Sequence, residues 1–217
     1  MKMMIKTSDH YLFHFPEHSL AATEIDKIVA EQEASFKEIV DTLGVIPDFK
    51  INYYFLETPE EVGREYGDNE PCYGFAREPH DIYAVYNQKI KCIGPHEDAH
   101  IISYLLSTPA YVFMREGLAM YFDKTQAGKA NEIWVKEYLE SGQYLKVVDL
   151  LEDEFFYNVD CNITYPIASA FTKFLIEKLG IKGYVEAYKL ADFSKDNLCK
   201  ILNCEDIDQE FINWIKK

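Results

Sequence analysis

The sequence predicts an α+β fold, and two patterns along the chain lead to this prediction. Runs rich in β-branched and aromatic residues lie before Gly94, whereas apolar residues recur at helical spacing from Gly94 almost to the end. A chain that places strands first and helices afterwards is typical of α+β domains. The breaks between helical segments are turn or cap residues, so we expect the 217 residues to form one globular domain, or two closely packed subdomains, without a flexible linker.

The first segments are a strand and a long helix. Residues 10–15 predict a strand that ends at Pro16, and Ser19 is suited to cap a helix over residues 20–43 that stops at Gly44. The apolar stripe of this helix consists of Ile25, Ile28, Val29, Phe36, Ile39 and Val40.

Further strands complete a small mixed sheet. Residues 50–56 are rich in aromatic and β-branched side chains and predict a strand, after which Thr58 and Pro59 open a short helix. Residues 72–76 and 81–86 predict two more strands, arranged as a hairpin or as neighbours.

The remaining chain is predicted to be helical. The expected helices cover approximately residues 95–107, 110–124, 130–140, 162–179, 181–191 and 205–216. A boundary near residue 125 separates an N-terminal half, residues 1–125, from a helical C-terminal half, residues 126–217. Both halves are expected to belong to one compact domain, in which the second half closes a cleft.

Charge and composition exclude several classes of partner. The net charge is −15 and the pI is about 4.8, whereas binding to nucleic acid or to an anionic membrane needs clustered Lys and Arg. A solvated negative surface also keeps a protein soluble. No run approaches the roughly 20 apolar residues of a membrane span, and the N-terminus has no apolar signal region, so we expect a cytoplasmic protein. The five cysteines lack close CxxC pairing, which favours reduced thiols.

The pentapeptide from His96 to His100 carries the most specific chemical signal. Two imidazoles four residues apart lie on the same face of a helix, close enough to bind one metal ion, and Glu97 between them can take a proton from a metal-bound water. Pro95 is tolerated in the first helical turn. Ser103 and Ser107 share the face of the histidines, Asp98 falls on the side away from them, and the opposite face is apolar, with Ile101, Ile102 and Leu105.

Glu116 on the next predicted helix is the candidate third ligand. Three protein ligands leave one coordination position open, as in catalytic zinc sites. Gly117 and Ala119 flank Glu116 with little bulk, so we expect them to let the two metal helices approach each other. A purely structural metal site is disfavoured because only three protein ligands converge.

These residues resemble the gluzincin metallopeptidases, which combine HExxH with a downstream glutamate and include thermolysin-like and related aminopeptidase families. The likeness is closer to small stand-alone peptidase-MA-like domains with a zincin-like fold. It extends to Gly74-Phe75-Ala76 and Ile82-Tyr83-Ala84-Val85 before the metal helix, and to Tyr165-Pro166-Ile167-Ala168 after Glu116.

The resemblance implies a zinc-dependent peptidase that acts on peptides or proteins. His96, His100 and Glu116 would bind one zinc ion, and Glu97 would be the general base that passes a proton from water to the leaving amine. The strand around residues 82–86 would be the sheet edge along which an extended peptide pairs. Tyr165 is the candidate oxyanion stabiliser, with a packing role as its alternative; His80 is a second candidate, expected to be exposed.

Two departures from the gluzincin pattern concern the surroundings of the metal. The spacing between His100 and Glu116 is shorter than in the thermolysin-like enzymes. Those enzymes also carry an aspartate four residues after the glutamate, whereas this chain has Met120. Asp123 lies two turns along the helix and is either a surface residue or a group that orients a ligand. A zincin-fold protein that holds metal and binds a partner without turnover is the alternative function.

Overall fold

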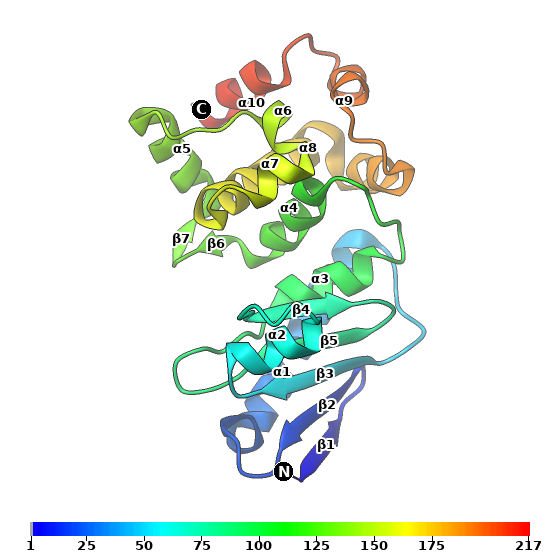
Figure 1. The fold of residues 1–217 in the computed structure, drawn as a ribbon. Coiled ribbons are helices and arrows are strands. Elements are labelled where there is room, and N and C mark those ends of the chain that lie inside the picture. Colours follow the sequence, from blue (N-terminus) through cyan, green and yellow to red (C-terminus); the bar gives the residue numbers. More distant parts are fainter. Residues whose placement is uncertain (1) are drawn as a thin grey trace. The chain divides into compact units, whose positions relative to one another are not determined.

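The computed structural model describes residues 2–217, which fall into two compact units, Met1–Leu105 and Leu106–Lys217 (Figure 1). The first unit contains the sheet and the second is mainly helical. This architecture confirms the predicted α+β class with a mixed sheet and a helical C-terminal half. The predicted domain division near residue 125 stays a prediction. The boundary between the two compact units falls between residues 105 and 106, so the helix that carries Glu116 belongs to the second unit.

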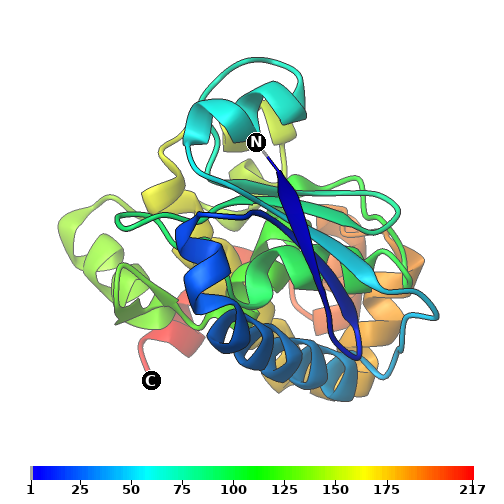
Figure 2. The ribbon, with the colours of Figure 1, turned by 90° about the horizontal axis from the view of Figure 1, so that it is seen from below.

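The sheet of the first unit has five strands in the order β1-β2-β3-β5-β4 (Figure 2). The strands are β1 (Met3–Thr7), β2 (Tyr11–Pro16), β3 (Ile51–Leu56), β4 (Gly74–Arg77) and β5 (Asp81–Val85). The central strands β2, β3 and β5 run parallel, and β1 and β4 pair antiparallel at the two edges. The sequence pattern does not predict β1, because its residues Met3, Met4 and Ile5 are all exposed and show no alternation.

The expectation that residues 82–86 form the sheet edge is wrong. Strand β5 has β3 on one side and β4 on the other, so β4 is the edge strand next to it. The predicted hairpin pairing of these two segments is confirmed, with Gly74 opposite Ala84 and Arg77 opposite Asp81. The hairpin with β4 therefore places β5 inside the sheet rather than at its edge.

The helices of the first unit are α1 (Leu20–Leu43), α2 (Pro59–Tyr66) and α3 (Pro95–Ser103). The predicted caps of α1 are confirmed: the Ser19 side chain accepts a hydrogen bond from Ala22 N, and Gly44 ends the helix in the left-handed conformation at φ 70°. Aromatic side chains dominate the core beneath α1. Phe13 stacks on Phe55 at 6.2 Å between ring centroids, and Tyr53 stacks on Phe55 at 4.8 Å.

The second unit consists of helices and one short hairpin. Its elements are α4 (Val112–Asp123), β6 (Thr125–Gln126), β7 (Lys129–Ala130), α5 (Asn131–Ser141), α6 (Val147–Leu150), α7 (Asp153–Tyr157), α8 (Cys161–Leu190), α9 (Lys195–Leu202) and α10 (Ile207–Ile215). The long α8 is interrupted at Gly180, where φ is 70° and ψ is 158°, so the two predicted helices over residues 162–179 and 181–191 are both present. The short α6, α7 and α9 fall in segments for which no helix is predicted.

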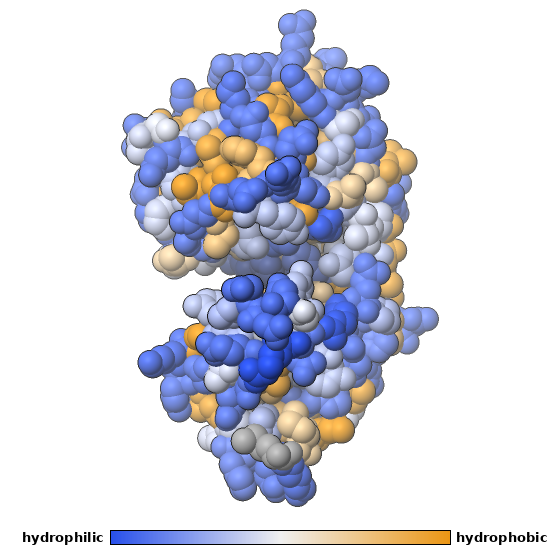
Figure 3. Space-filling model, in the orientation of Figure 1, coloured by the Kyte–Doolittle hydropathy of each residue, from blue (hydrophilic) through white to orange (hydrophobic). Residues whose placement is uncertain are grey.

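Hydrophilic residues cover most of the face shown in Figure 3, and apolar residues appear on it in small groups. Within the described residues 2–217, no helix combines the length and the apolar composition that a membrane span requires.

Candidate metal centre

Helix α3 begins with the residues that carry the predicted chemistry. Gly94 precedes it with φ at 117°, a backbone conformation that glycine adopts without strain, and Pro95 occupies the first turn. The helix packs on α1 and on strands β4 and β5. It ends at Ser103, so the prediction that it continues to residue 107 is wrong. Leu105 is therefore exposed rather than a core anchor, and the Ser107 hydroxyl donates to the Tyr188 carbonyl of the second unit.

The two histidines of α3 lie side by side. Their ring centroids are 5.1 Å apart with the ring planes at 78°, and a nitrogen of each imidazole lies within 4.8 Å of one in the other. His100 is 7% exposed and stacks on Tyr104, whereas His96 is half-buried. One turn of helix thus presents two nitrogen donors to a common point, as the four-residue spacing predicts.

Glu97, the predicted base, lies against the edge strand. A Cβ atom added to Gly74 of β4 would come within 3.3 Å of Glu97 Oε1. The Cys92 side chain is near the same point, at 3.8 Å from that position. Burial raises the pKa of the Cys92 thiol to about 12, and the charge of Glu97 acts in the same direction. The carboxylate of Glu97 and the side chain of Cys92 therefore both lie close to Gly74 of β4.

Asp98 points into the core on the far side of α3 from the histidines. It has no exposed surface, and its Oδ2 accepts hydrogen bonds from the Tyr11 hydroxyl at 2.5 Å and from Gln32 Nε2 at 2.9 Å. Burial raises the pKa of the Asp98 carboxyl well above its ordinary value. The prediction that Asp98 faces away from the imidazoles agrees with these contacts, but sequence reasoning missed its buried partners.

Glu116 projects from α4 of the second unit and is half-buried. The first turn of α4 lacks a cap from its own sequence; instead Asp153 accepts a hydrogen bond from Val112 N at 2.9 Å. Arg115 donates to the carbonyls of Pro109 and Ala110, which ties the helix to the preceding turn. These contacts fix the start of the helix one turn before Glu116.

Gly117 was predicted to let the two metal helices approach each other, but it faces a different helix. A Cβ at this position would meet the Ala168 carbonyl oxygen and Thr172 Oγ1 of α8, each at 2.7 Å. Ala119 is fully buried. The expectation that Gly117 lets the two metal helices approach is therefore wrong, because this residue faces α8 and permits the close packing of α4 on α8.

Tyr165 lies near the start of α8, the helix packed along α4. Its ring stacks on Phe156 at 6.1 Å between centroids, with 18° between the planes, and the side chain remains half-buried. The stacking gives the phenol a fixed packing partner within the second unit. Both the packing role and the oxyanion role of Tyr165 stay predictions.

His80 and Asp123 are the weaker candidates from the sequence. His80 is half-buried and its ring lies 5.3 Å from that of Phe49, with 36° between the ring planes, so the expectation that it is exposed is wrong. His80 directly precedes Asp81, the first residue of β5, whereas Ala84, the partner of Gly74, lies near the other end of that strand. His80 is therefore about 13 Å along the strand from Ala84. Asp123 is half-buried at the end of α4, where its predicted roles stay open.

The donor chemistry of His96, His100 and Glu116 suits zinc. Among residues 2–217 these three form a group of side chains that could hold a metal ion, each offering one ligand atom. Two imidazoles and one carboxylate match the donor sets of catalytic zinc sites, whereas magnesium and calcium prefer oxygen ligands alone.

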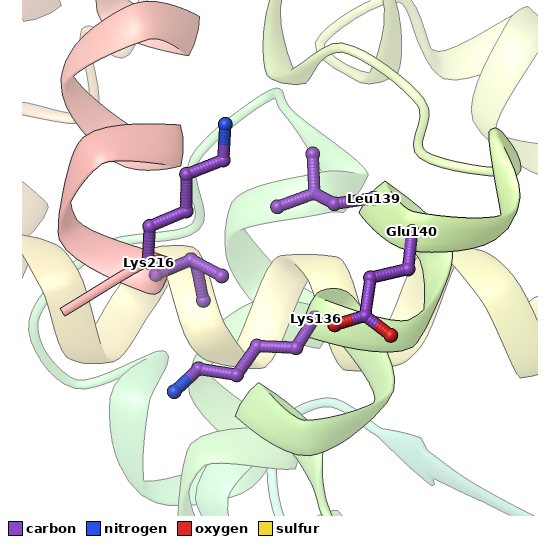
Figure 4. Close-up of a pocket in the computed structure, with 5 residues that line it drawn as sticks. Lys136, Leu139, Glu140 and Lys216 are labelled. Carbon is purple, nitrogen blue, oxygen red and sulfur yellow. The ribbon is translucent and has the colours of Figure 1, made fainter.

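A separate hollow lies in the second unit between α5 and the end of α10 (Figure 4). It encloses about 290 Å³ and is lined by Lys136, Leu139, Glu140, Ile215 and Lys216. The lining combines two ammonium groups, one carboxylate and two aliphatic side chains, and it contains none of the residues predicted to bind a metal or to activate a metal-bound water.

The residues that sequence reasoning missed are Gln32, Asp98 and Gly74. Gln32 interrupts the apolar stripe of α1 between Ile28 and Phe36, and it is fully buried. Two signals were available in the sequence. Gln32 is a polar residue at a core position of a predicted helix, and Asp98 is a carboxylate on the apolar side of α3. The contact of Gly74 with Glu97 depends on the sheet register and had no signal in the sequence.

Known proteins resemble this chain only distantly in sequence. No protein-family model matches the chain, and no curated protein matches it. Among solved structures, the chain is similar to the crystal structure of an aminopeptidase N family protein from Idiomarina loihiensis. The sequences are 14% identical and the TM-score is 0.45, over 100% of this chain and 44% of that one. The chain thus spans less than half the length of this neighbour.

Proposed function

We propose that this protein is a zinc-dependent metallopeptidase of the gluzincin type. The observation that carries the proposal is the arrangement on α3, where two adjacent imidazoles flank a glutamate that lies against the edge strand β4. His96 and His100 bind the metal through one nitrogen each, and Glu116 of α4 supplies the third ligand. This donor set leaves a position for water or substrate.

Bound zinc supplies an activated water and polarises the scissile carbonyl. Glu97, which lies within α3 between the two histidines in sequence, would act as the general base: its carboxylate would accept a proton from the attacking water and deliver it to the leaving amine. Tyr165 donates a hydrogen bond to the oxyanion of the tetrahedral intermediate.

Strand β4 takes over the peptide-binding role that the sequence had assigned to residues 82–86. Tyr73 and Val85 form a hydrogen-bonded pair, with 2.8 Å between Val85 N and Tyr73 O. Since such pairs alternate along an antiparallel ladder, the backbone groups of Gly74 and Ala76 face the edge of the sheet. A substrate in extended conformation pairs with these groups and passes beside Glu97.

The test combines metal analysis with hydrolysis of a mixed peptide library, with and without a chelator. The purified protein is expected to contain close to one zinc per chain and to lose cleavage when zinc is removed. Glu97→Gln is expected to keep zinc and to lose at least about a thousandfold in kcat, because it cannot accept the proton. Glu60→Gln, an exposed glutamate of α2, is the matched control and should cleave like the parent.

Three outcomes decide between the functions. Protein without zinc that also fails to take up added zinc would overturn the metal site. Zinc binding with no cleavage of any peptide by the parent would leave the alternative, a zincin-fold protein that binds metal and a partner. Cleavage that survives in Glu97→Gln would remove Glu97 from the role of base.

A further inference from the structure

The first turn of α3 has no side-chain cap of its own. Gly94 supplies none, and Pro95 cannot donate a backbone hydrogen bond. The helix is nine residues long, and His96 and Glu97 lie in that first turn. Because short helices fray from their ends, the positions of both side chains depend on what holds Gly94.

The side chain of Gln32 on α1 supplies the missing contacts. Gly94 N donates to Gln32 Oε1 at 2.6 Å, and Gln32 Nε2 donates to Gly94 O at 3.2 Å. The same amide nitrogen donates to Asp98 Oδ2 at 2.9 Å, one turn further along α3. One buried side chain thus contacts α3 both at its cap residue and on its core-facing side.

Tyr11 of β2 connects α1 and α3 to the sheet. Its hydroxyl lies 3.1 Å from the backbone carbonyl oxygen of Gln32 and 2.5 Å from Asp98 Oδ2, the atom to which the Gln32 side-chain amide also donates. Tyr11, Gln32 and Asp98 have no exposed surface. Three elements of the first unit, β2, α1 and α3, are therefore held by hydrogen bonds that depend on direction and length, unlike apolar contacts.

The contacts restrict rotation of α3 about its own axis. Asp98 projects about 200° away from both His96 and His100, at about 100° per residue. A helix held by Asp98 on its core side and by Gly94 at its start presents the imidazoles in one direction. An apolar residue at position 32 would fill the same space without fixing that direction.

We propose that Gln32 is a positioning residue for the metal centre: by fixing Gly94 and Asp98 it presets the imidazole pair before metal binds. The proposal has two consequences. Protection of the Gly94 amide from hydrogen exchange needs no metal, whereas the effect on zinc affinity rests on the proposed zinc site.

Gln32→Met tests the proposal because it keeps the length of the side chain and removes its hydrogen bonds. In the metal-free protein, amide hydrogen exchange at Gly94 is expected to become about tenfold faster or more. Zinc affinity, measured by competition with a chromogenic chelator, is expected to fall about tenfold in protein that remains folded by circular dichroism. Tyr11→Phe, which removes only the hydroxyl, is expected to shift both quantities in the same direction by less.

The matched control is Ile28→Ala on the same helix, one turn before Gln32 and equally buried. It removes apolar packing without touching the hydrogen bonds, so its zinc affinity should stay within about twofold of the parent even though it lowers stability. Equal losses of affinity in Ile28→Ala and Gln32→Met would assign the effect to stability and overturn the positioning role.

The two proposals fail in distinguishable ways. Unchanged exchange at Gly94 in Gln32→Met, or unchanged zinc affinity in that variant, overturns the positioning role of Gln32. A parent protein that binds no zinc overturns the metal site, and the exchange measurement then still decides whether Gln32 holds the start of α3.

Discussion

At the scale of single residues, the surroundings of Glu97 leave little room for change. Gly74 provides space that the Glu97 carboxylate needs, since an added Cβ would approach Oε1 to 3.3 Å. We expect Gly74→Ala to displace the carboxylate by a few tenths of an ångström. If Glu97 is the general base as proposed, proton transfer depends on that position, and kcat for peptide hydrolysis should fall about tenfold.

The same variant separates a local effect from a loss of fold. Gly74 has no positive φ, so alanine adopts its backbone conformation without strain, and the thermal midpoint should stay near that of the parent. Zinc content should be unchanged. Full activity of Gly74→Ala would show that Glu97 has more freedom than its contact with β4 indicates.

The Cys92 thiol gives a pH-dependent prediction. Its pKa is raised to about 12 by burial and by the charge of Glu97, so it is a neutral thiol at ordinary pH. At pH 8 only about one molecule in ten thousand carries the reactive thiolate. Iodoacetamide should therefore spare Cys92 in the native protein, and labelling should rise about tenfold per pH unit as the pH increases toward that pKa.

Peptide mapping by mass spectrometry checks this labelling, with the exposed Cys161 as the internal reference. In Glu97→Gln the negative charge is absent, so the pKa of Cys92 should fall and its labelling should become faster. Labelling of Cys92 as fast as Cys161 at pH 8 would contradict the burial of this thiol.

At the scale of elements, the packing of α4 on α8 depends on Gly117. Alanine there would bring its Cβ to 2.7 Å from the Ala168 carbonyl oxygen, so the two helices must move apart. We expect Gly117→Ala to lower the free energy of unfolding by about 1–3 kcal/mol, as overpacked cores do. Urea denaturation measures the loss.

A second helical glycine provides the control. At Gly183 of α8, an added Cβ would meet only Leu179 Cβ, at 3.1 Å, and alanine there gains helix propensity. Gly183→Ala should therefore change the free energy of unfolding by less than about 1 kcal/mol. An equal effect of the two substitutions would mean that the α4–α8 approach does not limit stability.

The elements that were predictable are those with strong local signals. Helix α1 was predicted with both ends, because Ser19 and Gly44 are cap residues that flank a long apolar stripe. Strand β1 and helices α6 and α7 lack such signals, since β1 is exposed and the two helices are short and have no side-chain cap of their own. Helix α9 has cap residues at both ends, Ser194 and Asn203, but it is only eight residues long and was not predicted. Helix α6 is capped from a distant part of the sequence, because Asp208 of α10 accepts a hydrogen bond from Val147 N at 2.7 Å.

The candidate site shows the same division between local and distant signals. The imidazole pair followed from helical spacing within five residues, and the structure places the two rings together. The edge strand, the partner of Gly117 and the buried contacts of Asp98 all depend on pairs distant in sequence. Periodicity carries no information about which strand becomes an edge, so β5 was assigned a position that belongs to β4.

At the scale of the whole molecule, the proposed ligands come from both compact units, with His96 and His100 on α3 and Glu116 on α4. A ligand that binds the folded chain and not the unfolded one stabilises the fold by mass action. Free zinc at a hundred times its Kd should contribute about 2.7 kcal/mol. For a chain of this size, the thermal midpoint should then rise by about 5–10 °C.

Differential scanning fluorimetry of chelator-treated protein, with and without added zinc, measures this shift. Magnesium should leave the midpoint unchanged, because two of the three donors are imidazoles, which magnesium does not favour. Glu116→Gln should reduce the zinc-dependent shift, and His100→Ala should abolish it, since each removes one proposed ligand. A shift of full size in Glu116→Gln would place the third ligand elsewhere and would leave only the imidazole pair of α3 as the metal-binding element.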